Sequence, residues 1–113
     1  MHFTQEIIEG LTQGVAVYRP TPDGQDFLLT YLNPAAARLV RRDRAELIGQ
    51  TLREAFPGAA AMGLLELFRQ VHATGEPGLL EASRYQDDHL DMWAANRVFR
   101  LASIGRASCR ERV

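Results

Sequence analysis

The chain has 113 residues, which suffice for one compact domain and are few for two. Its 46% hydrophobic, 8% aromatic and 24% charged residues are typical of a globular protein and exclude a disordered or collagen-like chain. Thirteen basic and fourteen acidic residues give a net charge of -1, which excludes binding of nucleic acid or anionic lipid through overall charge. The sequence has neither an apolar run of about 20 residues nor a start typical of a signal peptide, so we expect no membrane contact and a cytoplasmic location.

The first third of the chain predicts a helix followed by a β-hairpin. Apolar residues recur at helical spacing over residues 3–11, which indicates a short amphipathic helix. Residues 14–19 are rich in β-branched and aromatic side chains and precede Pro20, as expected of a strand. Residues 21–24, Thr-Pro-Asp-Gly, are typical of a tight turn, so residues 27–32 should form the second strand of the hairpin.

Short helices are predicted after this hairpin. Asn33 can cap a helix with its side chain, and Pro34 fits the first helical position because no hydrogen-bond donor is needed there. We therefore expect a helix to begin at Pro34. Two more helix starts are indicated by a capping residue with an acidic residue three positions later, namely Asp43 with Glu46 and Thr51 with Glu54.

A long helix and two long strands complete the predicted elements. Over residues 59–73 one stripe of the helix is apolar, which predicts the longest helix, and the Thr-Gly-Glu-Pro of residues 74–77 should end it. Residues 79–85 and 90–101 then form two strands joined around Asp87 and Asp88. In the second strand two sets of side chains alternate: Trp93, Ala95, Arg97, Phe99 and Leu101 against Met92, Ala94, Asn96 and Val98.

This order of elements resembles the PAS domain family. The motifs that carry the resemblance are residues 14–18, 31–39, 44–57 and 68–77, together with Trp93, so the likeness covers about residues 5 to 103. The resemblance implies an α+β fold in which helices pack on one face of a five-stranded antiparallel sheet and a pocket lies between them. It also implies that the last strand sits between the first and the fourth. The sequence looks most like the PAS segments of bacterial multidomain sensor kinases.

The final residues, 104–113, are similar to the translation of a widely used sequencing adapter. We therefore expect residues 1–103 to be a PAS-like sensor domain cut before its last strand, and residues 104–113 to be an artefact in which Cys109 has no role. Loss of the last strand would leave two strand edges unpaired and would make the chain marginally soluble. Because the tail alternates in character, it could also occupy the place of that strand.

The sequence offers little that indicates catalysis or a cofactor. It lacks a phosphate-binding loop, a nucleophile elbow and a phosphoacceptor motif, so the chain is not expected to be an enzyme. His72 lies at the end of the long helix, where the resemblance does not imply haem ligation. The absence of cysteine before Ser108 excludes the family's flavin-cysteine photochemistry. The acidic cluster around the predicted turn suggests either a metal site or solvated turn residues, and it consists of Asp87, Asp88 and Asp91. We favour solvated turn residues. The sequence does not identify a cofactor.

Large side chains with an apolar body suggest a ligand pocket. Its candidate wall residues are Tyr31, Phe56, Phe68, Met92 and Trp93. An ordinary filled core explains the same residues.

Two functions follow from the resemblance. The first is a sensory domain of a two-component signalling protein, a histidine kinase fragment, in which a small-molecule ligand or a partner shifts the arrangement of helices and sheet to control a downstream effector domain. The alternative is a ligand-free domain for dimerisation or spacing. A homodimer would form through the helix of residues 3–11 and the outer face of the sheet, where Arg97 and Arg100 are candidates for contact. A small enzyme would need acid and base groups that the sequence does not suggest.

Overall fold

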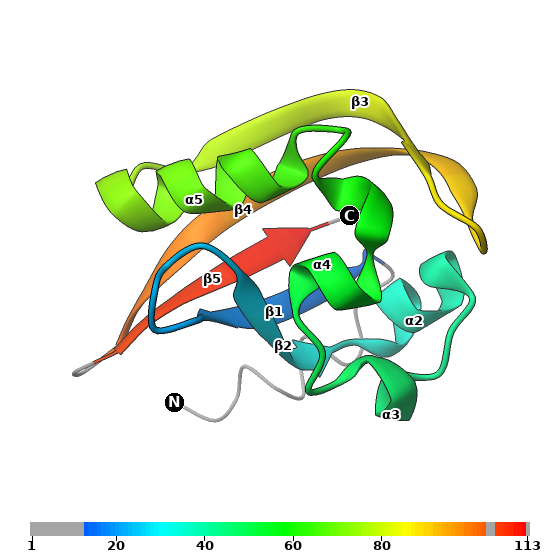
Figure 1. The fold of residues 1–113 in the computed structure, drawn as a ribbon, viewed down its shortest axis with the longest axis horizontal. Coiled ribbons are helices and arrows are strands. Elements are labelled where there is room, and N and C mark those ends of the chain that lie inside the picture. The colour runs from blue at the N-terminus through cyan, green and yellow to red at the C-terminus, as the bar shows by residue number, and fades with distance from the viewer. Residues whose placement is uncertain (1–12, 104–105, 113) are drawn as a thin grey trace.

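The computed structural model describes residues 13–103 and 106–112, and Figure 1 shows helices packed against a curved antiparallel sheet. The predicted helix over residues 3–11 lies outside the described residues. The strand order is β2-β1-β5-β4-β3. The elements are β1 (Val15–Pro20), β2 (Phe27–Leu32), α2 (Pro34–Val40), α3 (Arg44–Leu47), α4 (Leu52–Ala55), the 3-10 turn η1 (Pro57–Ala59), α5 (Leu64–Thr74), β3 (Gly78–Gln86), β4 (Asp91–Ser103) and β5 (Arg106–Arg112).

The hairpin of β1 and β2 is confirmed, and β2 has the bounds that the sequence predicts. Its turn is closed by the Thr21 N–H, which donates to the Asp26 carbonyl at 2.9 Å. Gly24 sits in this turn with a φ of 70°, a conformation that costs glycine little. One irregularity between Val17 and Tyr18 shifts the register, so that Tyr31 pairs with Val17. This shift determines the direction in which the Tyr31 side chain points.

The predicted helix caps are present. The Asn33 side chain accepts from the Ala36 N–H, and Pro34 occupies the first position of α2. Thr51 and Glu54 form a complete capping box at the start of α4. Asp43 caps α3 by accepting from the Ala45 N–H at 3.2 Å.

The prediction that one long helix spans residues 59–73 is wrong at its start. Pro57 begins a separate 3-10 turn, and α5 begins only after Gly63, whose φ of 92° lies in the left-handed region. A helix cannot run through a left-handed residue, so the segment divides there. The apolar stripe is nevertheless real, because Leu64, Phe68 and Val71 are all buried.

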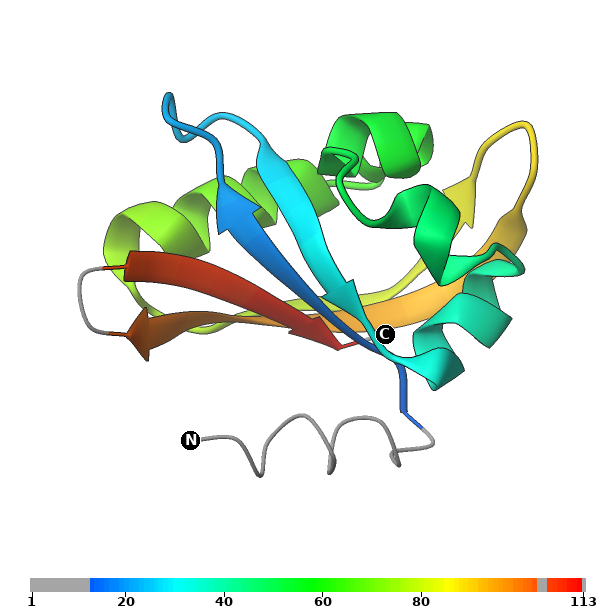
Figure 2. The same cartoon turned by 90° about the horizontal axis from the view of Figure 1, so that it is seen from below.

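The helices lie over one face of the sheet, as Figures 1 and 2 show. The alternation predicted for β4 is confirmed: Asn96 and Val98 are buried on the helix side, whereas Trp93 is 70% exposed on the opposite face. In the part of the chain that the structure describes, no helix has both the length and the apolar character to cross a bilayer.

The centre of the sheet is occupied by β5, which pairs antiparallel with both β1 and β4. This is the position that the resemblance implies for the last strand. The segment that takes it is Arg106–Arg112, within the tail whose alternation suggested that it could fill this place. Backbone pairing on both sides leaves neither β1 nor β4 with an open edge at this point.

Candidate functional site

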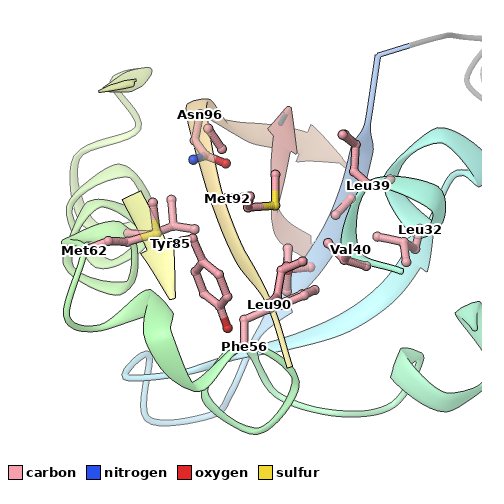
Figure 3. Close-up of a pocket in the computed structure, with 14 residues that line it drawn as sticks. Leu32, Leu39, Val40, Phe56, Met62, Tyr85, Leu90, Met92 and Asn96 are labelled. Carbon is pink, nitrogen blue, oxygen red and sulfur yellow. The ribbon is translucent and has the colours of Figure 1, made fainter. Parts of the chain in front are cut away.

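A cavity of about 50 Å³ lies between the inner face of the sheet and the helices (Figure 3). About 10–15 Å³ accommodates one water-sized sphere, so the space has room for a few atoms and is smaller than the cavity of about 150 Å³ that binds benzene in another protein. Its walls come from both halves of the chain and are mostly apolar. They are Ala16, Tyr18, Leu32, Ala36, Leu39, Val40, Phe56, Met62, Leu64, Tyr85, Leu90, Met92, Ala94 and Asn96.

The pleat of β4 supplies one side of this cavity. Met92, Ala94 and Asn96 are two residues apart, so their side chains point to the same face of the strand. Figure 3 shows Asn96 and Met92 together on β4, with Leu39 and Val40 of α2 across from them. The small side chains of Ala16, Ala36 and Ala94 line the cavity without filling it.

Asn96 is the unusual member of this wall. Its side chain is 2% exposed, and its Oδ1 atom has no hydrogen-bond partner among the described residues. A buried polar group without a partner costs about 1–3 kcal/mol, so native proteins rarely leave one unsatisfied. The sequence did not single out Asn96 as a site residue. The available signal was its place as the one polar residue in the set Met92, Ala94, Asn96 and Val98.

Tyr85 forms a second polar feature at the cavity. Its hydroxyl donates a hydrogen bond to the Asp87 carboxylate and accepts one from the Gly58 N–H at 3.3 Å, while its ring meets Phe56 edge-on at 6.2 Å. Burial raises the pKa of Tyr85 above its ordinary value of 10.0, and the hydrogen bond to Asp87 raises that pKa further. The phenol therefore stays protonated at neutral pH and is held by two partners.

Asp87 shapes the turn between β3 and β4. Its Oδ1 atom accepts from the His89 and Leu90 N–H groups, each at 2.8 Å. Partial burial raises the pKa of Asp87, but the hydrogen bonds from Tyr85 and these N–H groups lower it by more, so the pKa lies below its ordinary value. The carboxylate of Asp91, in turn, is bound by Arg84 through contacts of 2.8 and 2.6 Å. The structure thus places both carboxylates against protein donors, with Asp87 in the turn and Asp91 at the start of β4.

Of the five residues predicted to line a pocket, two line the cavity and three lie elsewhere. Phe56 and Met92 line the cavity. Phe68 does not, because it is fully buried in the core, where its ring meets Tyr18 at 5.0 Å. Tyr31 also lies elsewhere, beside the Arg44 guanidinium at 6.0 Å from its ring centre. Trp93 lies on the outer face of the sheet.

Each of these three residues lies away from the cavity for its own physical reason. Successive side chains of a strand point to opposite faces, so Trp93 must face away from a cavity that Met92 lines. Thr30 is an extra residue in β2, so Leu32 rather than Tyr31 follows Phe27 and Leu29 on the buried face of that strand. Phe68 points inward as expected, but the packed core under α5 receives it.

His72 lies outside the cavity. Its ring meets Phe27 edge-on at 6.0 Å, and its backbone carbonyl accepts a hydrogen bond from Arg100 at 3.0 Å. A cation at this position also interacts favourably with the C-terminal end of α5. Arg100 therefore points toward the helix layer, which corrects the expectation that it lies on the outer face of the sheet.

Comparison with known proteins places the chain in a family. A family model described as the PAS fold matches residues 9–84. No curated protein matches the sequence. Among solved structures, the chain is similar to the PAS domain of nitrogen regulation protein NR(II) from Vibrio parahaemolyticus, with 15% identity, a TM-score of 0.74, and coverage of 99% of this chain and 96% of that one.

Two further structures have the same fold. A sensory box sensor histidine kinase from Vibrio cholerae is 15% identical with a TM-score of 0.67, and the match covers 97% of this chain and 86% of that one. A PAS-B domain of Cycle from Drosophila melanogaster, solved with bound glycerol, is 12% identical with a TM-score of 0.67. The match covers 87% of this chain and 94% of that one. The α+β architecture, the central last strand and the matched residues agree, and the chain belongs to the PAS-fold family.

Proposed function

We propose that this chain is the sensory domain of a bacterial two-component signalling protein, a fragment of a cytoplasmic sensor histidine kinase, that responds to a small molecule. In this proposal residues 1–103 are the domain's own sequence and residues 104–113 are foreign to it. The observation that carries the proposal is the mostly apolar cavity between the sheet and the helices, with Asn96 among its wall residues. Likeness to a sensor histidine kinase of Vibrio cholerae supports the choice of protein class.

The cavity is placed where a ligand can affect both layers of the domain. Met92 and Asn96 belong to the sheet, whereas Val40 ends α2 and Phe56 precedes η1. A ligand that contacts these groups shifts the equilibrium between two arrangements of helices and sheet by its difference in affinity for them. An effector domain joined to the sensory domain would follow that shift.

A non-catalytic role suits the groups that line the cavity. PAS domains are in general sensory modules rather than enzymes. Tyr85, whose pKa is raised, has its hydroxyl engaged by Asp87 and Gly58. We assign no catalytic residue, because acid–base chemistry requires an ionisable group within reach of the substrate.

Native mass spectrometry of the purified chain tests the sensory proposal. We expect a small molecule to accompany the folded chain and to leave on denaturation. Ala94→Leu fills the cavity and should abolish this binding, whereas the matched control Ala95→Leu changes the exposed outer face of the same strand and should retain it. A chain that binds no small molecule, or binding that survives Ala94→Leu, would contradict the proposal.

One observation favours the alternative function, dimerisation through the sheet. Trp93 is 70% exposed and Leu79 is 55% exposed on the outer face, where Arg97 pairs with Leu79 across β3 and β4. Large exposed apolar side chains on one face of a protein often mark contact surfaces. An empty dimer in the mass spectrum would support this alternative over the sensory role. The helix expected to share the interface, residues 3–11, lies outside the described residues.

A further inference from the structure

A ligand can reach the inner wall of the cavity only if part of that wall moves. The wall residues Ala16, Leu32 and Ala36 are almost completely buried. We propose that residues 83–94, the lid hairpin, swing away from the helices to admit the ligand, and that the Tyr85 hydroxyl is the latch that holds this hairpin closed. The inference rests on the proposed sensory function and names the route by which the ligand enters.

The lid hairpin projects beyond the rest of the sheet. Its two strands pair with each other from Ser83 with Ala94 to Gln86 with Asp91. On its other side β4 pairs with β5 only from Arg97 onward among the described residues, and β3 is the last strand of the sheet. Figure 1 shows the turn between β3 and β4 at the right, beyond the end of β5. A two-stranded hairpin without further neighbours is only marginally stable in water, so this part of the sheet can open first.

A bulge separates the lid hairpin from the body of the sheet. Between the Leu80–Asn96 pair and the Ser83–Ala94 pair, β3 contains one residue more than β4, and the register shifts there. A bulge interrupts the ladder of backbone hydrogen bonds and lets the strand bend. This bulge supplies a hinge at the base of the lid hairpin.

One buried side chain holds the lid hairpin against the helices. Tyr85 is 6% exposed and is the only residue of the lid hairpin that is buried. Its hydroxyl accepts a hydrogen bond from the Gly58 N–H at 3.3 Å, and its ring meets Phe56 edge-on at 6.2 Å. Both partners lie in the segment from the end of α4 to η1. Loss of the contact to Gly58 therefore frees the hairpin from the helix layer.

Movement of the lid hairpin would open the cavity without unfolding the rest of the domain. The hairpin contributes Tyr85, Leu90, Met92 and Ala94 to the wall. Figure 3 shows Tyr85 and Met92 on the side of the cavity away from Val40 of α2. The opposite wall belongs to β1, β2 and α2, which keep their own pairing and caps when the hairpin swings out.

Cysteine labelling tests the lid, because a buried thiol reacts only when the protein opens. In the full chain, Cys109→Ser removes the single cysteine, and Ala16→Cys then places a thiol in the stationary wall. Val71→Cys places one in the core under α5 instead. The closed cavity of about 50 Å³ has no room for iodoacetamide, so the reagent reaches position 16 only after the hairpin moves. We expect Ala16→Cys to react faster than Val71→Cys, at a rate that changes little with low urea, since a local opening exposes little surface.

Two further changes separate the latch from overall stability. Tyr85→Phe removes the hydroxyl and should speed the reaction of Ala16→Cys about tenfold or more. Thr51→Ala removes the capping box of α4, which stays formed while the lid hairpin is open, so it should speed the reaction of Val71→Cys alone. Ala36→Cys, on the same stationary wall, is the second reporter in case Ala16→Cys impairs folding.

Each result decides the inference. Acceleration of Ala16→Cys by Tyr85→Phe but not by Thr51→Ala supports the latch. Equal rates and equal urea dependence of Ala16→Cys and Val71→Cys would mean that only global unfolding exposes the cavity, which overturns the lid. Equal acceleration of Ala16→Cys by both changes overturns the role of Tyr85.

The labelling test is independent of the test of the proposed function, because it uses no ligand. A chain that opens at the lid hairpin but carries no small molecule would contradict the sensory proposal alone. A chain that carries a small molecule but shows no local opening would contradict the lid alone.

Discussion

The hydroxyl of Tyr85 and the carboxylate of Asp87 are joined by a hydrogen bond at the rim of the cavity. The same hydroxyl accepts from the Gly58 N–H, so the β3–β4 turn is connected to η1 through one side chain. Gly58 allows this approach, because a Cβ atom there would lie 2.4 Å from the Gln86 carbonyl oxygen. The β3–β4 turn is thus held against η1 by a specific polar contact.

Tyr85→Phe should destabilise the domain while keeping the ring in place. The change leaves the Gly58 N–H and one oxygen of Asp87 without their partner, which costs about 1–3 kcal/mol in free energy of unfolding. Urea denaturation measures this loss. As the control, Asp88→Ala alters an exposed residue of the same turn and should change the free energy by less than about 0.5 kcal/mol. Equal stability of Tyr85→Phe and wild type would show that the contact contributes nothing.

The contribution of Asp87 should depend on pH with a defined sign. Partial burial raises its pKa, but hydrogen bonds from Tyr85, His89 and Leu90 lower it below the ordinary value of 3.8. A carboxyl group whose pKa is lower in the folded state stabilises the fold above its unfolded pKa, and this contribution is lost as the pH falls through the folded pKa.

Asp87→Asn should therefore be less stable than wild type at neutral pH, and the difference should shrink as the pH is lowered below 3.8. Urea denaturation at a series of pH values measures the difference, with Asp88→Asn as the control. A difference that stays constant down to the acid limit would mean that the charge of Asp87 is not involved.

The two buried asparagines should respond in opposite ways to loss of the carboxamide. Asn33→Ala removes the acceptor of the Val15 and Ala36 N–H groups and should cost about 3 kcal/mol or more in free energy of unfolding. Asn96→Leu removes an atom that has no described partner and should be neutral or stabilising. Thermal and chemical denaturation compare the two variants, and a large loss of stability in Asn96→Leu would show that the Asn96 carboxamide stabilises the fold.

Trp93 should contribute to association rather than to folding. Because its side chain is 70% exposed, Trp93→Ala should change the free energy of unfolding by less than about 0.5 kcal/mol. If the outer face pairs two copies, the same change should weaken the dimer by about tenfold or more in sedimentation equilibrium, since exposed tryptophans at interfaces are often central to binding. Ile48→Ala, at a residue 41% exposed outside the sheet, is the control that should leave association unchanged.

Local signals in the sequence determined much of the secondary structure. The caps at Asn33 and Thr51 act through hydrogen bonds that span three residues, so their partners could be read directly from the chain. The bounds of β2 and the alternation in β4 followed from residue types and from the two-residue period of a strand. The start of α5 was missed because its boundary depends on the left-handed backbone of Gly63, and a glycine can occur without adopting that conformation.

The sequence by itself determined the order of the elements and the two faces of β4, while the resemblance to the PAS family implied a central last strand. Only the tertiary structure decided which residues meet at the cavity. It directed Phe68 into the packed core, turned Tyr31 outward through a register shift and left the Oδ1 atom of Asn96 without a described partner. The physical reason is that caps and periodicity depend on neighbours in the chain, whereas burial and hydrogen-bond satisfaction depend on side chains that reach the same place from distant strands and helices.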